Sequence, residues 1–158
     1  MSSAPPLPPG YLVSADPAWL DLPLIHAYLA RESYWAPSIP PETVRRSIAN
    51  SVCLGAYHQS MPGGPPRQVG FARVISDRAT FAYLCDVFVL PDHRGKGLSK
   101  ALVAAALGHP ELLGLRRWML VTKDAQSLYA RFGFVKPVEP DRYMERVDRD
   151  IYRRQNQA

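Results

Sequence analysis

The sequence of 158 residues contains few cysteines and no long apolar segment. Its two cysteines, Cys53 and Cys85, lie in apolar, strand-like runs, where we expect small buried hydrophobic residues rather than a disulfide or a nucleophile. No apolar run approaches the roughly 20 residues of a membrane-spanning helix, and the first residues lack the charged and apolar regions of a signal peptide. We therefore expect a cytoplasmic protein without a membrane partner.

Metal-ligand patterns and concentrated charge are also lacking. The four histidines show no metal-ligand spacing with one another or with the cysteines, so we expect no metal site. The formal charge is +5, from 19 basic and 14 acidic residues, which mildly favours anionic partners. Because the basic residues are spread among acidic ones rather than clustered with aromatics, nucleic acid is the least favoured of these partners.

The length predicts one domain with a single core. Residues 1–10 contain four prolines and are expected to form a disordered leader, residues 11–150 the domain, and residues 151–158 a frayed, mixed-charge tail. No internal repeat is present, and no composition shift marks a second domain.

Hydrophobic periodicity and turn residues predict the order of the elements. We expect a strand at 11–14, a helix at 17–30, a helix from Pro41, and a hairpin of strands at 51–57 and 68–75. After these come a strand reaching residue 90, a helix at 98–107, a strand at 118–121, a short helix capped by Asp124, strand pieces at 135 and 138, and a last strand at 143–147. This order, β-α-α-β-β-β-α-β-α-β, predicts an α/β fold with a mixed sheet and helices on its faces.

The chain is organised around the segment from Tyr83 to Leu107. Between residues 84 and 90 only Asp86 is polar, as in a buried strand, and Pro91 ends the run. A basic, glycine-containing loop follows and leads into the helix at 98–107. Glycines at a helix start let free backbone N–H groups approach an anion closely, and the helix dipole adds positive charge there. The segment therefore predicts a phosphate or pyrophosphate site.

Two families with glycine-rich loops are excluded by spacing. A Walker A loop requires Gly-Lys followed by Ser or Thr, whereas Gly97 is followed by Leu98. A dinucleotide-binding fingerprint requires a third glycine, and the stretch Gly95-Lys96-Gly97-Leu98-Ser99-Lys100 lacks it.

The loop resembles that of the GNAT family of acetyl-CoA-dependent N-acetyltransferases. Arg94-Gly95-Lys96-Gly97-Leu98-Ser99 follows the family pattern [RQ]-x-x-G-x-[GA] between a V-x-V strand and a helix, except that Ser99 stands where Gly or Ala is usual. Serine is small, so we expect a local adjustment rather than loss of binding. About thirty residues later, RRWMLVTKDAQSLYARFGF is similar to the family's second unit, a strand followed by a short helix that carries a tyrosine.

This resemblance implies a sheet that splays between the strands at 83–90 and 118–121, with acetyl-CoA in the opening. Where the family often carries Asn to hold the pantetheine, this chain has Lys123-Asp124, which puts that contact in doubt. The residues implied to contact acetyl-CoA are Val87, Phe88, Val89, Arg94, Gly95, Lys96, Gly97, Leu98, Ser99, Asp124 and Tyr129.

The resemblance also implies the catalytic groups. The phenol of Tyr129 is suited to protonate the departing CoA thiolate, and the alternative is a core aromatic beside Phe132 and Phe134. A backbone N–H between Val87 and Val89 is expected to stabilise the oxyanion.

The acceptor amine is expected to meet a second group of residues. Asp86, a carboxylate in an apolar strand, is predicted to bind or deprotonate the amine, with an ion pair to Arg73 as the alternative. Tyr83 is a weaker candidate. The resemblance implies that the loop with Tyr34 and Trp35 forms part of the acceptor wall, and the alternative is that both rings cap the core beneath their loop. Arg73 is a further candidate for acceptor binding.

Three functions remain open from the sequence. The favoured one is direct acetyl transfer from acetyl-CoA to a primary amine of a small molecule, peptide or protein. The second is a non-catalytic acyl-CoA-binding regulatory module, against which the presence of Tyr129 argues. The third is an acylating enzyme or binding module associated with nucleic acid. A homodimer is common in the resembled family.

Overall fold

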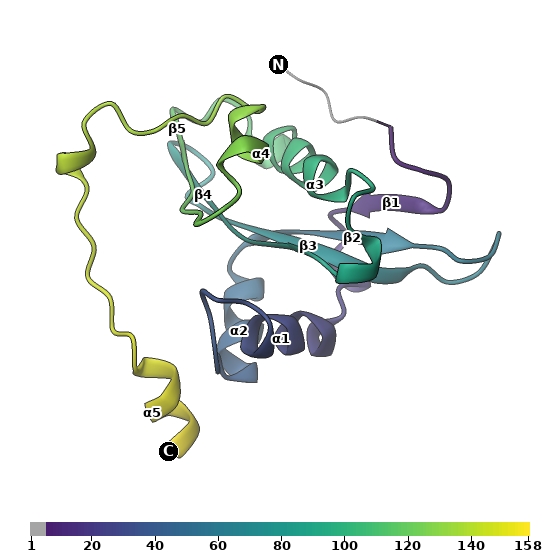
Figure 1. Ribbon diagram of the computed structural model, residues 1–158, viewed down its shortest axis with the longest axis horizontal. Coiled ribbons are helices and arrows are strands. Elements are labelled where there is room, and N and C mark those ends of the chain that lie inside the picture. Colours follow the sequence, from purple (N-terminus) through teal and green to yellow (C-terminus); the bar gives the residue numbers. More distant parts are fainter. Residues whose placement is uncertain (1–5) are drawn as a thin grey trace.

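The computed structural model describes residues 6–158 and contains a five-stranded sheet with helices on both faces (Figure 1). The strands follow one another in sequence order, with β1 to β4 antiparallel and β5 parallel to β4. This arrangement confirms the predicted mixed α/β fold. The strands are β1 (Tyr11–Ser14), β2 (Val52–His58), β3 (Arg67–Ser76), β4 (Phe81–Val89) and β5 (Arg117–Met119).

Two pairs of helices cover the two faces of the sheet. Helices α1 (Leu22–Arg31) and α2 (Pro41–Ala49) lie on one face, and α3 (Leu98–Leu107) and α4 (Gln126–Ala130) lie on the other (Figure 1). Each pair encloses its own core cluster. The larger cluster is centred on Leu98, Leu102 and Val103 of α3, and the smaller one joins Ile25 and Leu29 of α1 to the sheet.

Helix α1 begins later than the periodicity predicts. Residues Pro17–Trp19 form a separate 3-10 turn, because the Asp16 carboxylate accepts a hydrogen bond from the Ala18 N–H. The carboxylate of Asp21 then caps α1 by accepting from the Leu24 N–H at 3.0 Å, which makes Pro23 a first-turn residue, where proline is tolerated. Two caps five residues apart therefore divide the predicted helix at 17–30.

Strand β4 bends in its middle and parts from β5. Phe71 pairs with Phe88 and Arg73 with Cys85, so two residues of β4 face one residue of β3, which is a β-bulge. At the bulge, Asp86 has a left-handed backbone with φ of 53°. Pairing between β4 and β5 spans only Phe81–Tyr83 and Arg117–Met119, and β4 continues to Val89 paired with β3 alone. The predicted splay of the sheet follows from this short pairing.

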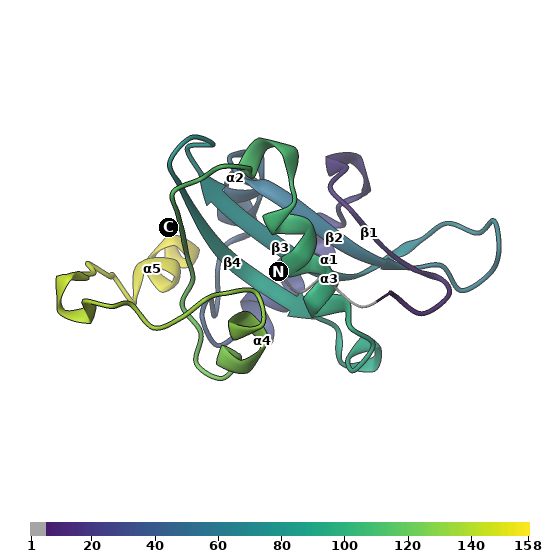
Figure 2. The ribbon, with the colours of Figure 1, turned by 90° about the horizontal axis from the view of Figure 1, so that it is seen from above.

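The predicted strand pieces at 135 and 138 and the last strand at 143–147 are wrong. The chain from 135 to 150 is exposed and contains only a 3-10 turn at Pro140–Arg142. Pro137 and Pro140 remove backbone donors from this stretch, and charged residues interrupt its apolar pattern. Figure 2 shows this segment extending away from the sheet before the chain returns to α5.

The predicted frayed tail is a helix, α5 (Ile151–Gln157), that packs on the body of the molecule. Tyr152 contacts the smaller core cluster, and the Asn156 side-chain amide donates to the carbonyl of Ser38 at 2.9 Å. At the other end of the chain, residues 1–5 of the predicted leader lie outside the described residues. Leu7 of the same leader packs against the larger core cluster.

Within residues 6–158, no helix combines the length and apolar character of a membrane span. In the same part of the chain, no three His, Cys, Asp or Glu side chains are grouped so that they could hold a metal ion.

Candidate active site

The start of α3 forms the anion-binding arrangement that the sequence predicts. Gly95 and Gly97 both have left-handed backbones, with φ of 75° and 84°, and Gly97 is the N-cap of the helix. No side chain accepts a hydrogen bond from the first N–H groups of α3, so these donors remain available to a ligand. A Cβ added at Gly95 would meet no atom within 4 Å, which leaves the space in front of the loop open. The loop therefore fits a phosphate group.

A cavity of about 260 Å³ lies against this loop. Six of the predicted contacts line this cavity: Val89, Arg94, Gly95, Gly97, Leu98 and Ser99. The small side chain of Ser99 is thus accommodated in the wall. The cavity is also lined by His93, and by two residues that the sequence analysis did not assign to it, Lys100 and Leu128.

The two basic residues of the motif face other partners. The Arg94 guanidinium donates to the Val89 carbonyl at 3.0 Å and to the Tyr28 hydroxyl at 3.2 Å, so it ties the loop to β4 and α1. The Lys96 ammonium donates to the Asp92 carbonyl at 2.9 Å and does not line the cavity. Lys100 in the first turn of α3 supplies the cavity with a cation in its place.

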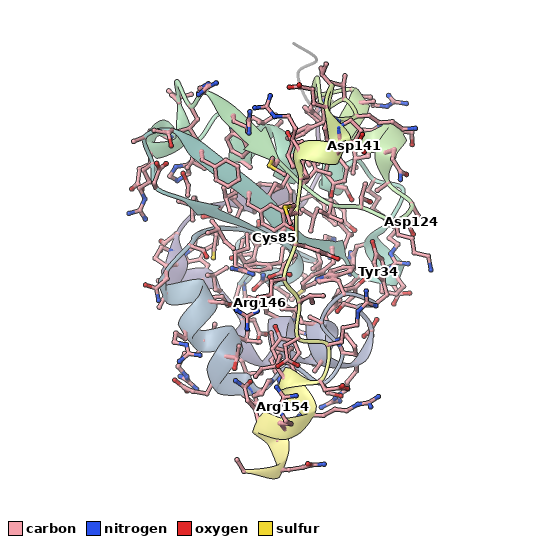
Figure 3. All side chains as sticks on the ribbon, turned by 90° about the vertical axis from the view of Figure 1, so that its left-hand side faces the viewer. Tyr34, Cys85, Asp124, Asp141, Arg146 and Arg154 are labelled. Atoms are coloured by element: carbon pink, nitrogen blue, oxygen red, sulfur yellow. The ribbon has the colours of Figure 1, made fainter. Side chains whose placement is uncertain are left out.

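A second cavity, of about 310 Å³, lies where β4 and β5 separate. It is lined by all three aromatic residues predicted to meet the acceptor, Tyr34, Trp35 and Tyr83, together with Asp86 and Tyr129. The two cavities meet the same elements, because Val87 and Val89 belong to β4, and Leu128 and Tyr129 are adjacent in α4. Figure 3 views the side of the molecule where Tyr34, Cys85 and Asp124 of the second cavity are labelled.

Asp86 is held by two partners on different elements. Its Oδ2 accepts from the Arg73 guanidinium at 2.7 Å, and its Oδ1 accepts from the Trp35 indole N–H at 2.9 Å. Burial opposes the charge of Arg73, and the adjacent Asp86 carboxylate raises the Arg73 pKa. The ion pair with Arg73 that the sequence left as an alternative is confirmed. Arg73 itself does not line the second cavity and reaches it through Asp86.

Tyr129 lies in the larger core cluster and also lines the second cavity. Burial raises the pKa of its phenol to about 12, with added effects from Tyr34 and Asp124. The phenol is therefore protonated at neutral pH and can donate a proton. Its ring packs edge-on against Phe134, with 6.0 Å between centroids, so Tyr129 is a core aromatic that also lines a cavity.

Two predicted contacts are placed differently. Phe88 is buried in the smaller core cluster, where its ring stacks on Tyr28 at 3.9 Å, so only its backbone can face the opening. Asp124 does not cap α4: the N-cap is Ala125, whose N–H donates to Thr122 Oγ1 at 3.0 Å. Asp124 lies instead in the wall of the second cavity.

Comparison with known proteins identifies the family of this chain. The family model described as an acetyltransferase (GNAT) domain matches residues 50–136. The chain belongs to the GNAT acetyltransferase family. This stretch runs from β2 through α4 and contains most of the walls of both cavities.

Individual GNAT relatives agree with this assignment. A Gibberella zeae protein named as an acetyltransferase is 36% identical over 138 residues, covering 77% of this chain and 76% of its own. A crystal structure assigned to the GNAT family, from Xanthomonas campestris pv. campestris, is 52% identical with a TM-score of 0.82, covering 91% of this chain and 97% of its own. A Clostridium acetobutylicum acetyltransferase solved with acetyl-CoA shares the fold, with a TM-score of 0.61 at 14% identity, covering 87% of this chain and 94% of its own.

Several residues of this GNAT site were missed from the sequence. Lys100 directly follows the loop motif, and its place in the first turn of the helix could have revealed it. Cys85 lines the second cavity, and burial raises the pKa of its thiol to about 12. Tyr152 of α5 lies close enough to Asp86 and Arg73 that their charges act on its pKa, which burial raises. The position of Tyr152 follows from the folded C-terminal segment, which the sequence did not predict.

Proposed function

We propose that the protein transfers an acetyl group directly from acetyl-CoA to a primary amine. The observation that supports this proposal is the position of Tyr129, which lines the cavity with aromatic walls and directly follows Leu128, a residue that lines the cavity at the glycine loop. A cosubstrate whose phosphates lie at α3 would extend along the opening beside β4 and present its thioester near Tyr129. Acetyl-CoA, when bound, supplies an acyl group on a thiol leaving group.

Each group of residues along the opening has a separate role in the proposed reaction. The N–H groups at the start of α3 and the Lys100 ammonium bind the phosphates. A backbone N–H of residues 87–89, on the part of β4 that β5 does not reach, stabilises the oxyanion that forms as the amine nitrogen bonds to the acyl carbon. Tyr129 donates its proton to the departing sulfur as the carbon–sulfur bond breaks. Because the pKa of Tyr129 is raised to about 12, its phenol is protonated at neutral pH.

We propose that Asp86 attracts the acceptor ammonium and accepts, through water, the proton that the amine releases. Its carboxylate lines the acceptor cavity, and Arg73 and Trp35 fix its orientation. The test is the pH profile of kcat/KM in Asp86→Asn. A flattened basic rise with the acetyl-CoA affinity retained supports this role. A profile of the same shape as that of the wild type would assign Asp86 to structure alone.

The proposed reaction is tested by mixing the purified protein with acetyl-CoA and a panel of amines. Thiol release and the mass of the amine product are measured together. A product heavier by one acetyl group, formed in step with thiol release, is the expected result. Acetyl-CoA binding without turnover on any amine would favour the non-catalytic acyl-CoA-binding module.

We also propose that the protein forms a homodimer through residues 135–147. This segment exposes large apolar side chains, including Val138 at 94% and Met144 at 97%, and β5 is the outermost strand of the sheet. A second copy could cover both features by exchanging the segment. Light scattering should give twice the monomer mass for the wild type and a monomer for Val138→Glu/Met144→Glu. A monomeric wild type at micromolar concentration would contradict the proposal.

A further inference from the structure

The connector between α1 and α2 presents two aromatic rings to the acceptor cavity in fixed positions. The Trp35 indole N–H donates to Asp86, and the Tyr34 hydroxyl accepts from the backbone N–H of Lys123 at 3.0 Å. The rings pack edge to face with 5.0 Å between centroids and an angle of 85° between planes. Both polar ends are therefore bonded, and the rings hold one another in place.

These rings nevertheless remain accessible. Tyr34 is 53% exposed and Trp35 is 40% exposed, and neither belongs to either core cluster of the described residues. Capping of the core therefore does not account for them. The Lys123 ammonium lies over the Tyr34 ring at 5.7 Å from its centroid, whereas among the described residues no cation lies over the Trp35 ring. Fixed, exposed aromatic faces in a cavity wall are suited to stack on a flat ligand.

The cavity and the residues directly behind it carry as many cations as carboxylates. Asp86, Asp124 and Lys123 line the wall, and Arg73 pairs with Asp86 from behind it. An acceptor with several ammonium groups would need surplus carboxylates, and one with a phosphate or carboxylate would need surplus cations. Since the wall offers neither, aromatic surface is what remains to select the body of the acceptor. The volume of about 310 Å³ fits a small molecule.

We infer that the acceptor is a small primary amine carried on a short linker by an aromatic ring, with the ring stacked against Trp35 and the amine directed to Asp86. This inference rests on the proposed acetyltransferase function and names the class of its acceptor. Trp35 is the residue that determines this specificity.

The inference is tested with three amines of graded shape. 2-Phenylethylamine has the flat ring, 2-cyclohexylethylamine has the same size and linker without a π face, and spermidine has several charges and no ring. Acetyl-CoA affinity is measured alongside by titration calorimetry. We expect kcat/KM for 2-phenylethylamine to exceed that for each of the other two by about tenfold, as aromatic stacking energies predict.

Variants separate the ring of Trp35 from its hydrogen bond. Trp35→Ala should lower kcat/KM for 2-phenylethylamine by about tenfold and change the rate with 2-cyclohexylethylamine less, with acetyl-CoA affinity unchanged. Trp35→Phe, which keeps a ring, should recover most of that preference. Trp19→Ala is the matched control, because Trp19 is similarly exposed, at 44%, and lines neither cavity.

The possible outcomes separate a failure of the aromatic acceptor class from a failure of the acetyltransferase function. Turnover that is fastest with spermidine or equal for the two ring-sized amines would overturn the aromatic class and leave the acetyltransferase standing. A preference for 2-phenylethylamine that survives in Trp35→Ala would overturn the role of Trp35. Absence of acetyl-CoA binding would overturn both the function and the inference.

Discussion

The indole of Trp35 and the carboxylate of Asp86, 51 residues apart in the sequence, are joined by a 2.9 Å hydrogen bond in the wall of the second cavity. The bond ties the α1–α2 connector to the bulge of β4, and the same carboxylate accepts from Arg73 at 2.7 Å. The position of the aromatic wall thus depends on the strand that carries the bulge.

Loss of the Asp86 charge should destabilise the fold as well as the site. Asp86 and Arg73 are 9% and 14% exposed, so Asp86→Asn leaves a mostly buried guanidinium without its counterion. We expect the free energy of unfolding to fall by about 3 kcal/mol in urea denaturation. Arg73→Gln/Asp86→Asn should recover part of this loss, because no buried charge is then left unpaired. If the single variant is as stable as the wild type, the pair does not contribute as described.

Removal of the Tyr129 hydroxyl should affect turnover and leave binding intact. Tyr129→Phe keeps the ring that packs on Phe134 and removes the proton donor, so we expect kcat to fall about 100-fold. The acetyl-CoA dissociation constant, from calorimetry, should stay within twofold. Tyr143→Phe, on the exposed C-terminal segment, serves as the control. Unchanged turnover of Tyr129→Phe at every pH would remove this residue from the mechanism.

The cation that binds the phosphates should be Lys100 rather than Lys96. Lys100 lines the cavity at the start of α3, whereas the Lys96 ammonium donates to the Asp92 carbonyl. Lys100→Ala is expected to weaken acetyl-CoA binding about tenfold, and Lys96→Ala by less than twofold, in calorimetric titrations at low salt. The reverse order would mean that the loop rearranges when the ligand binds.

The protein should lose stability as the pH rises above 9. Burial raises the pKa of Cys53 from 9.0 and those of Tyr57 and Tyr129 from 10.0, each to about 12. Between these ordinary and raised values the unfolded chain releases protons that the folded chain keeps, so the free energy of unfolding falls as pH increases. Cys53 alone contributes a slope of up to about 1.4 kcal/mol per pH unit. Urea unfolding between pH 8 and 11 measures this slope, which Cys53→Ala should reduce. A flat profile in the wild type would contradict these raised pKa values.

Local sequence signals were sufficient where an element is specified by its own residues. The loop from Arg94 to Ser99, the helix that follows it and the isolated strand of Trp118 were all located correctly, because glycine, proline and periodicity act over short distances. The predicted C-terminal strand at 143–147 was wrong, because apolar residues at strand spacing form a strand only where they pair with a sheet, and this segment extends away from the sheet (Figure 2).

Contacts between distant segments were not accessible in this way. The ion pair of Asp86 with Arg73 could be proposed because Arg73 lies on the predicted strand at 68–75, which directly precedes the predicted strand of Asp86. The hydrogen bond from Trp35, the caps that divide α1 and the proximity of Tyr152 to Asp86 depend on loop conformations that the sequence pattern does not specify. The direction of Lys96 was missed for the same reason.

The most direct test of this account is a calorimetric titration of the wild-type protein with acetyl-CoA, beside Ser99→Phe. Ser99 lines the anion cavity, so a phenyl ring there would fill the space assigned to the phosphates. Circular dichroism confirms that both proteins are folded. The account predicts micromolar binding with one site per chain in the wild type, and loss of that binding in the variant. A folded wild-type protein that does not bind acetyl-CoA, or a variant that binds it equally well, would contradict the assignment of the cavity at α3 to this cosubstrate.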